Sequence, residues 1–251
     1  MGRLYGKVGF LTGGGAGIAK CSAIEFIKEG AQVAIVDINE AVGRKAEADI
    51  RAAGGDALFI QADVTQEADV KRAVEAAVAR FGKLDILVNN AATNPYAGPI
   101  IDCDTPRWDK THEVNLRGPL VWTQAAWRGG MKQHGGCVIN ISSVGGFRTN
   151  IALGVYDIFK CALIHMTEQL AAELAPKVRV NCLAPGLIKT DFAKYLWEDG
   201  KGDHVAQRYP LKRLGEPDDI GEAALYLAAG ASWVTGQTIV LDGGGLIRFA
   251  D

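Results

Sequence analysis

The chain has 251 residues, 48 % of them hydrophobic, and a formal net charge of −2 at pH 7. This length and hydrophobic content suit one α/β unit with a large core, so we expect residues 1–251 to form a single domain. The balanced charge provides no basic footprint, which makes nucleic acid an unfavourable partner and favours small molecules. The five cysteines include no CxxC pair and no signal peptide is visible. We therefore expect reduced thiols, a cytoplasmic location and no metal bound by the cysteines.

The first elements in chain order predict a nucleotide-binding turn. An apolar run over 7–12 is typical of a strand, and a glycine-rich turn follows it, ahead of a helical pattern. Glycines allow positive φ and let the backbone approach a diphosphate, and the helix N-terminus offers unpaired N–H groups. A second apolar run over 33–37 ends in Asp37, a position from which a carboxylate can accept hydrogen bonds from ribose hydroxyls.

Strand and helix patterns alternate along the remaining chain. We expect further strands near 57–61, 85–89, 136–141, 178–183 and 238–241, and helices over 40–53, 68–81, 122–133 and 156–175. Repeated βα units with wholly apolar strands predict a Rossmann-type doubly wound parallel sheet of about seven strands, with helices on both faces. The uncharged stretch 223–241 is long enough for a membrane span. Polar residues and glycines interrupt it, so we predict a buried helix, a turn and a buried strand instead.

Tyr156 and Lys160 lie one helical turn apart in the expected 156–175 helix, and Ser143 precedes them. A tyrosine hydroxyl titrates near pH 10, so it exchanges protons at neutral pH only when a cation stabilises the phenolate. A lysine four residues further on lies on the same helix face. This pair alone is a weak signal, and the nucleotide-binding turn at the other end of the chain is what makes an enzyme the favoured interpretation.

Together these motifs resemble the short-chain dehydrogenase/reductase family over nearly the whole chain. The resemblance implies an NAD(P)-dependent oxidoreductase, and the run 181–190 is most similar to the carbonyl- and retinal-reducing members. It also implies the cofactor-binding positions Thr12, Gly13, Gly15, Gly17, Ile18, Asp37, Ile38, Asp63, Val64, Asn89, Ala91, Tyr156, Lys160, Pro185, Gly186, Ile188 and Thr190.

The resemblance further implies a catalytic tetrad of Asn115, Ser143, Tyr156 and Lys160. Tyr156 would be the general acid in ketone reduction and the base in alcohol oxidation. Ser143 would bond the substrate oxygen, with Ser142 as the alternative, and Lys160 would lower the pKa of Tyr156 and hold the nicotinamide ribose. Asn115, in a helical kink, would position a water that connects Lys160 to solvent, or else make a structural hydrogen bond in its helix.

Three features depart from the family pattern. Ala19 and Ala92 stand where the family has glycine, and each adds one methyl group at a close-packed point. The residues between Tyr156 and Lys160 lack the usual small residue and serine. We expect Asp157 and Phe159 to face away from the Tyr156/Lys160 side of the helix, with Phe159 in an interface or in the core, and activity to be retained.

The segment 190–210 is expected to form a lid over the substrate. Its aromatic residues suit a hydrophobic ketone or secondary alcohol, whereas Arg148 suits an anionic group, and the sequence leaves both open. Two other functions compete. Enoyl reduction usually goes with a longer tyrosine-to-lysine spacing in relatives of this fold, and a catalytically idle NAD-binding sensor or scaffold would not need the tetrad. The other wall-forming residues are expected to be Thr93, Asn94, Pro95, Tyr96, Val144, Gly145, Phe147 and Arg148, and the lid residues Phe192, Tyr195, Leu196, Trp197 and Tyr209.

Cofactor choice and assembly complete the expectations. Asp37 would repel a 2′-phosphate and no basic residue stands at 14–16, so NAD(H) should be preferred to NADP(H). The four histidines lack metal-ligand spacing, so no metal is expected. The 156–175 helix and the uncharged C-terminal run carry more apolar surface than one subunit should bury, which predicts a homotetramer, with a dimer as the alternative.

Overall fold

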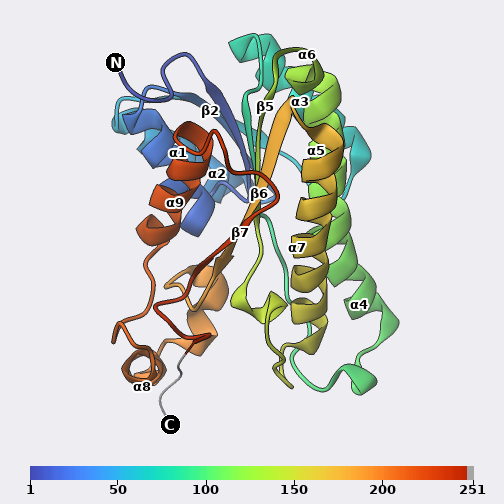
Figure 1. Cartoon of the computed structure of the whole chain (residues 1–251), viewed down its shortest axis with the longest axis vertical. Helices are drawn as coiled ribbons and strands as arrows, with labels where there is room; N and C mark the ends of the chain where they lie inside the picture. Colours follow the sequence, from blue (N-terminus) through green and yellow to red (C-terminus); the bar gives the residue numbers. More distant parts are fainter. Residues whose placement is uncertain (248–251) are drawn as a thin grey trace.

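The computed structural model describes residues 1–247, and its centre is a seven-stranded parallel sheet (Figure 1). The strands are β1 (Val8–Thr12), β2 (Gln32–Asp37), β3 (Asp56–Gln61), β4 (Ile86–Asn89), β5 (Gly136–Ile141), β6 (Val178–Pro185) and β7 (Thr238–Leu241). Their spatial order is β3-β2-β1-β4-β5-β6-β7, and every neighbouring pair is parallel. The strand order reverses beside β1, and such a switch point places a ligand crevice at the carboxyl ends of the strands.

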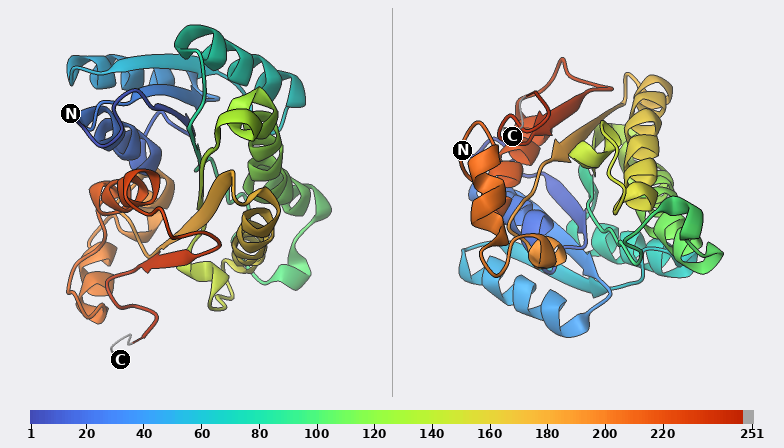
Figure 2. Two further views of the ribbon diagram at one scale, coloured as in Figure 1. Left: turned by 45° about the horizontal axis from the view of Figure 1, so that its top comes forward. Right: turned by 90° about the horizontal axis from the view of Figure 1, so that it is seen from below.

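Helices cover both faces of the sheet, as the two further views also show (Figure 2). One hydrophobic cluster joins the sheet to α1, α2 and α9, and a second joins it to α3, α5 and α7. The predicted Rossmann-type fold is therefore confirmed. The helices are α1 (Gly17–Lys28), α2 (Glu40–Ala52), α3 (Glu67–Phe81), α4 (Thr105–His112), α5 (Gly118–Ala126), α6 (Lys132–His134), α7 (Gly154–Leu174), α8 (Lys201–Arg208) and α9 (Pro217–Ala229).

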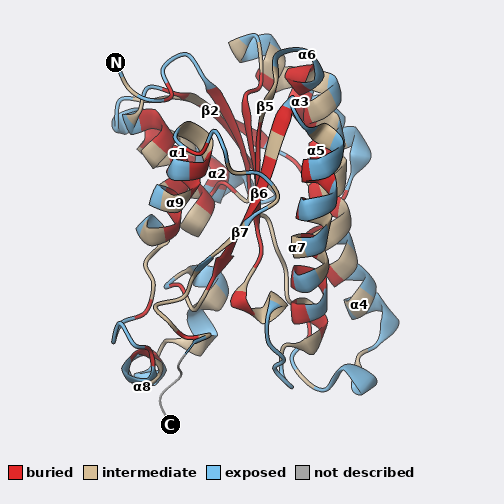
Figure 3. Ribbon diagram, viewed as in Figure 1, coloured by how far each residue is buried: buried red, intermediate tan, exposed pale blue. Residues whose placement is uncertain are grey.

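Burial explains why the strands could be recognised as apolar runs. All residues of β1 and β4 are buried, and so are the last five residues of β5 (Figure 3). A parallel sheet covered on both faces requires apolar side chains at successive positions rather than at alternate ones. Trp122 of α5 packs on Phe10 of β1 with ring centroids 5.1 Å apart, which fixes this helix against the sheet.

The helical expectations were less accurate. The helix expected over 122–133 is broken: α5 ends at Ala126, a π-helical turn spans Trp127–Met131, and Gly130 within it has φ 148°. Helices α4 and α8 were not predicted, although Asp104 caps α4 by accepting from the Arg107 N–H and a proline follows it. Among the described residues no helix is both long and apolar enough to cross a membrane.

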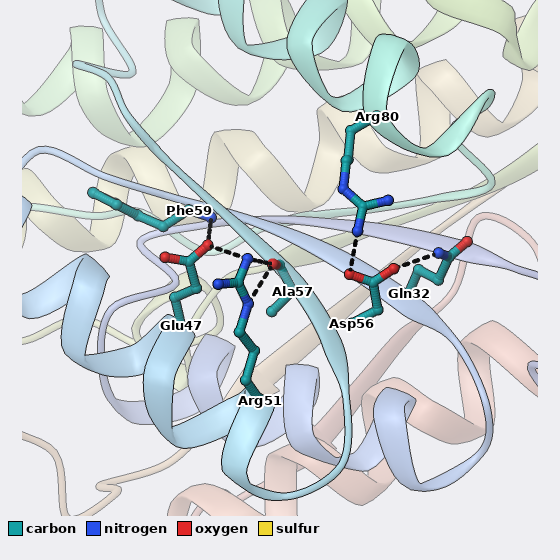
Figure 4. A network of polar contacts seen from close by, with 7 residues as sticks. All are labelled: Gln32, Glu47, Arg51, Asp56, Ala57, Phe59 and Arg80. Atoms are coloured by element: carbon teal, nitrogen blue, oxygen red, sulfur yellow. Dashed lines mark hydrogen bonds and ion pairs between the residues drawn. The ribbon is translucent and has the colours of Figure 1, made fainter.

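The two edge strands of the sheet differ in whether side chains bond their backbone groups. At the β3 edge, Arg51 donates to the Ala57 carbonyl (2.8 Å) and Glu47 accepts from the Phe59 N–H (3.1 Å), which satisfies backbone groups of the outermost strand (Figure 4). Within residues 1–247 no side chain bonds the backbone of β7 in this way. The prediction of a buried strand at this edge is wrong, because β7 is an edge strand and its residues are only half-buried or exposed.

Candidate active site

A cavity of about 890 Å³ lies at the carboxyl ends of the strands. It collects residues from the glycine turn after β1, the ends of β2 to β6, the start of α7 and the 190–210 segment. The sequence-predicted site residues that line it are Gly13, Gly17, Ile18, Asp37, Ile38, Asp63, Val64, Ala91, Ser143, Tyr156, Lys160, Pro185, Gly186, Ile188 and Thr190.

Four predicted site residues are not among those that line the cavity, namely Thr12, Gly15, Asn89 and Asn115. The Thr12 hydroxyl accepts from the backbone N–H groups of Asn90 (3.0 Å) and Ala91 (3.2 Å). The Asn89 amide is buried and donates to Asn140 (2.9 Å). The Thr12 and Asn89 side chains therefore support the cavity wall through these hydrogen bonds and do not line the cavity.

The glycine turn is shaped as a cradle for a phosphate group. Gly13 and Gly17 have φ of 63° and 55°, where other residues are strained. A Cβ at Gly13 would lie 2.9 Å from Asn90 Nδ2, so only hydrogen fits there. No side chain of the described chain caps α1 and no acidic residue stands in its first turn, which leaves its N–H groups facing the cavity. The turn therefore fits the diphosphate of a dinucleotide.

Asp37 defines the end of this cradle. Its Oδ2 accepts from the Gly15 N–H (3.1 Å) and its Oδ1 from the Asn39 N–H (3.0 Å), which holds the carboxylate at the cavity rim. The two nearby cations are engaged with other carboxylates: Arg44 pairs with Glu40, and Lys20 pairs with Asp49 at 2.5 Å. The residues thus fit a ribose with free hydroxyl groups.

Ser143, Tyr156 and Lys160 come together in the middle of the cavity. Ser143 follows β5 and its hydroxyl accepts from the Gly145 N–H (3.0 Å). Lys160 is buried beneath Tyr156, with Nζ 5.4 Å from the Tyr156 ring centroid, and donates to the Ile141 carbonyl (2.7 Å). The neighbouring Ser142 donates to the Lys160 carbonyl (2.7 Å), which ties the strand end to α7.

The protein alone does not lower the pKa of Tyr156. Burial raises the pKa of this hydroxyl, the charge of Asp157 raises it further, and a hydrogen bond with Ser143 opposes the rise. Burial also lowers the pKa of Lys160 to about 8. In the free protein desolvation is thus the largest influence on the Tyr156 hydroxyl, and lowering of its pKa by Lys160 stays a prediction for the cofactor-bound enzyme.

Asn115 occupies a π-helical turn, Glu113–Arg117, which matches the expected kink. Its Oδ1 accepts from the Thr93 N–H (2.8 Å) and its Nδ2 donates to the Thr93 carbonyl (2.9 Å). The partner is thus the loop after β4, not the helix itself. Because Thr93 lines the cavity, this pair of hydrogen bonds fixes one wall.

The expectation that Asp157 faces away from the site is wrong. This residue is buried and lines the cavity. Successive helical residues are only about 100° apart, and the cavity wraps around the N-terminal end of α7. Phe159 does turn away and lies in the subunit core, with its ring 4.9 Å from the Trp108 ring.

The 190–210 segment lines the same cavity as Ser143, Tyr156 and Lys160. It includes a short 3-10 helix, Asp191–Leu196, in which the Phe192 ring lies 6.2 Å from the Tyr156 ring. Trp197 was expected in the lid lining but points elsewhere, because its indole N–H bonds the Thr190 carbonyl (3.1 Å). Tyr195, Leu196 and Tyr209 line the cavity as expected, as do Thr93, Asn94, Val144, Gly145 and Arg148, whereas Pro95, Tyr96 and Phe147 do not.

Several lining residues were missed by sequence reasoning, among them Lys110, Asn150 and Leu153. Lys110 belongs to the unpredicted α4, and the other two belong to the loop before α7. Within residues 1–247 no group of three or more His, Cys, Asp or Glu side chains is arranged to hold a metal ion.

Comparison with known proteins agrees with this geometry. A family model described as Enoyl-(Acyl carrier protein) reductase matches residues 13–245. The chain is 37 % identical to human Dehydrogenase/reductase SDR family member 4 over 96 % of this chain and 88 % of the relative, and 38 % identical to an uncharacterized oxidoreductase of Thermotoga maritima over 95 % and 97 %.

Solved structures of similar proteins superpose closely. Levodione reductase has a TM-score of 0.93 at 28 % identity, covering 98 % of this chain and 100 % of that one. A 7α-hydroxysteroid dehydrogenase complexed with NADH and 7-oxo glycochenodeoxycholic acid has a TM-score of 0.92 at 34 % identity, covering 99 % and 97 %. Fold and site together define an oxidoreductase of the NAD(P)-using type. The chain belongs to the short-chain dehydrogenase/reductase family.

Proposed function

We propose that this protein interconverts a secondary alcohol and a ketone by NAD(P)-dependent hydride transfer, with residues 1–251 as one domain and 190–210 as its substrate lid. The supporting observation is the convergence of Ser143, Tyr156 and Lys160 in the same cavity as the glycine cradle. The turn, Asp37 and Asp63 would hold the dinucleotide, and the ends of β5 and β6 would hold its nicotinamide end.

The bound dinucleotide would supply or accept the hydride. Ser143 would hydrogen-bond the substrate oxygen and hold it beside the Tyr156 hydroxyl. Because burial keeps Tyr156 protonated, this residue is suited to donate a proton as a ketone is reduced. For alcohol oxidation Tyr156 must lose that proton, and the positive charge of Lys160 and of an oxidised nicotinamide would favour its loss.

The first test removes the acid. Tyr156→Phe should lower turnover at least about 100-fold, the usual scale of lost acid–base catalysis, while the affinity for reduced cofactor stays nearly unchanged. Steady-state kinetics and cofactor fluorescence would measure the two effects. A variant that keeps more than about a tenth of the wild-type turnover would contradict this role.

We also propose that NAD(H) is preferred to NADP(H). The Asp37 carboxylate would lie where a 2′-phosphate sits, and Arg44 and Lys20 are paired elsewhere. Asp37→Ala should narrow the difference in kcat/KM between the two cofactors by removing the repulsion. Equal or higher efficiency of the wild type with NADP(H) would defeat the proposal.

The names of the relatives favour carbonyl chemistry, since levodione and a 7-oxo steroid acid are ketones. The matching family model carries the name of an enoyl reductase, but Tyr156 and Lys160 are separated by one turn of α7, the short spacing that favours a carbonyl substrate. A catalytically idle sensor or scaffold remains the alternative from another class. A panel of ketones and alcohols, followed by the absorbance of reduced cofactor, would decide between them.

We further propose a homotetramer in the cytoplasm. The apolar excess expected on α7 supports assembly less than the sequence implied, because Phe159, Leu163, Leu170 and Ala171 are buried in the subunit. The open β7 edge and the fully exposed Trp233 beside it are the stronger support. A dimer is the alternative. All five cysteines are free thiols, which suits a reducing compartment.

A further inference from the structure

Asp157 is a buried carboxylate in the cavity wall with an unsatisfied oxygen. The residue is 6 % exposed, and its Oδ2 has no hydrogen-bond partner among the described residues. The carboxylate also accepts a hydrogen bond from the Asn150 backbone and feels the charge of Arg148. Burying a polar atom without a partner costs free energy, so an acceptor retained at such a position points to a donor that arrives in the cavity.

The carboxylate lies beside the group that should bind the substrate oxygen. A Cβ placed on Gly145 would lie 1.9 Å from Asp157 Oδ1 and 3.5 Å from Ser143 Oγ, so the two oxygens are neighbours. Only glycine at 145 leaves this space for the carboxylate. Asp157 also follows Tyr156 directly in α7, and both residues line the cavity together with Ser143.

The surrounding charges favour a neutral donor close to the reacting carbon. Lys110, Arg148, Asp191 and Arg208 line the same cavity as Asp157, so the lining carries charges of both signs. A negative group next to the reacting carbon would meet the Asp157 charge. Asn94 Oδ1 is a second buried acceptor of this lining without a partner in the described part of the chain. Two acceptors complement hydroxyl groups.

We propose that Asp157 is a specificity-determining residue that accepts a hydrogen bond from a substrate hydroxyl on the carbon next to the reacting carbon or one further along. The preferred substrates are then hydroxy ketones and the corresponding diols, rather than simple ketones. This inference rests on the proposed function and narrows its substrate class.

Three ketones of similar size test the inference in the wild type. Hydroxyacetone carries a donor, methoxyacetone carries only an acceptor with a similar inductive effect, and butanone carries neither. We expect kcat/KM for hydroxyacetone to exceed that for both others about ten- to hundred-fold, the range of a hydrogen bond to a charged group. Butanone or methoxyacetone reduced as efficiently as hydroxyacetone would overturn the inference and leave the proposed function standing. Failure to reduce these ketones or any of a wider panel would overturn both.

Two variants then assign the preference to Asp157. Asp157→Ala should abolish the ratio between hydroxyacetone and butanone, and Asp157→Asn, which keeps a neutral acceptor, should reduce it. Glu168→Gln removes a carboxylate from the exposed face of the same helix and should leave the ratio at the wild-type value. A thermal unfolding curve shows whether each variant is folded. If Asp157→Ala is unfolded, the ketone series in the wild type still tests the preference for hydroxy ketones. A folded Ala variant with an unchanged ratio would contradict the assignment.

Discussion

At the scale of single residues, Asp157 links function to stability. Burial raises its pKa to about 6, whereas an aspartate in an unfolded chain titrates near 3.9. The folded state therefore binds the extra proton between these values. The stabilising contribution of the protonated carboxyl is fully present below about pH 4 and is lost as the pH rises through about 6.

Asp157→Asn should accordingly be more stable than the wild type at pH 7.5, by about 1–2 kcal/mol in the free energy of unfolding. The difference should shrink as the pH falls to 5, because the wild-type carboxyl becomes protonated there. Urea unfolding at both pH values measures it, with Glu168→Gln as the control for loss of one charge. An Asn variant less stable than the wild type at both pH values would show that the carboxylate is a structural anchor.

Residue-scale reasoning from sequence predicted which side chains come together in the cavity but not their electrostatics. Tyr156 and Lys160 share a helix face, which the four-residue spacing alone predicts. The placement of Asp157 depends on Gly145, because a side chain at position 145 would fill the space of the Asp157 carboxylate. This contact arises where the loop after β5 packs on α7, and the sequence does not show it. The pKa of Tyr156 depended on burial, which no local pattern gives.

At the scale of elements, the strands were predictable because parallel strands covered on both faces are continuous apolar runs. Helices α4 and α8 were missed because they are short and mostly polar, and the break at Gly130 was missed because the apolar periodicity continues across it. The aromatic content of the 190–210 segment indicated a substrate wall, whereas the orientation of Trp197 followed from a hydrogen bond to Thr190 that sequence does not show.

The 3-10 helix Asp191–Leu196 provides the element-scale prediction. Phe192 is half-exposed and faces the Tyr156 ring, so Phe192→Ala should raise KM for an apolar ketone several-fold through lost apolar contact, with a smaller change in kcat. Phe147 is exposed to a similar extent but lies outside the cavity lining, which makes Phe147→Ala a matched control with an expected KM near the wild-type value. Equal effects of the two substitutions on KM would remove Phe192 from the substrate wall.

At the scale of the whole molecule, the two sheet edges predict where subunits meet. Side chains of α2 satisfy backbone groups of β3 and thereby block strand addition at that edge. The β7 edge has no such cover within the described residues. Trp233, which is 99 % exposed, lies in the turn before β7.

We therefore expect Trp233→Ser to reduce the molecular mass of the assembly, from tetramer towards dimer, in sedimentation velocity at micromolar concentration. Tyr5→Ser, another exposed aromatic position, serves as the control and should leave the mass unchanged. An unaltered tetramer in the Trp233 variant would place the interface elsewhere, and a stable, active wild-type monomer would exclude the assembly altogether.

The segment above the cavity has a small hydrophobic cluster of its own, built from Ala206, Tyr209 and Leu214 and separate from the two clusters that flank the sheet. A unit with separate packing can open at a lower free energy than global unfolding. It can also change its inner surface without disturbing Ser143, Tyr156 or Lys160, which are mounted on β5 and α7. Exchange of residues 190–210 for the equivalent segment of a relative should thus transfer substrate preference while the proposed proton-transfer groups and the sheet stay as they are.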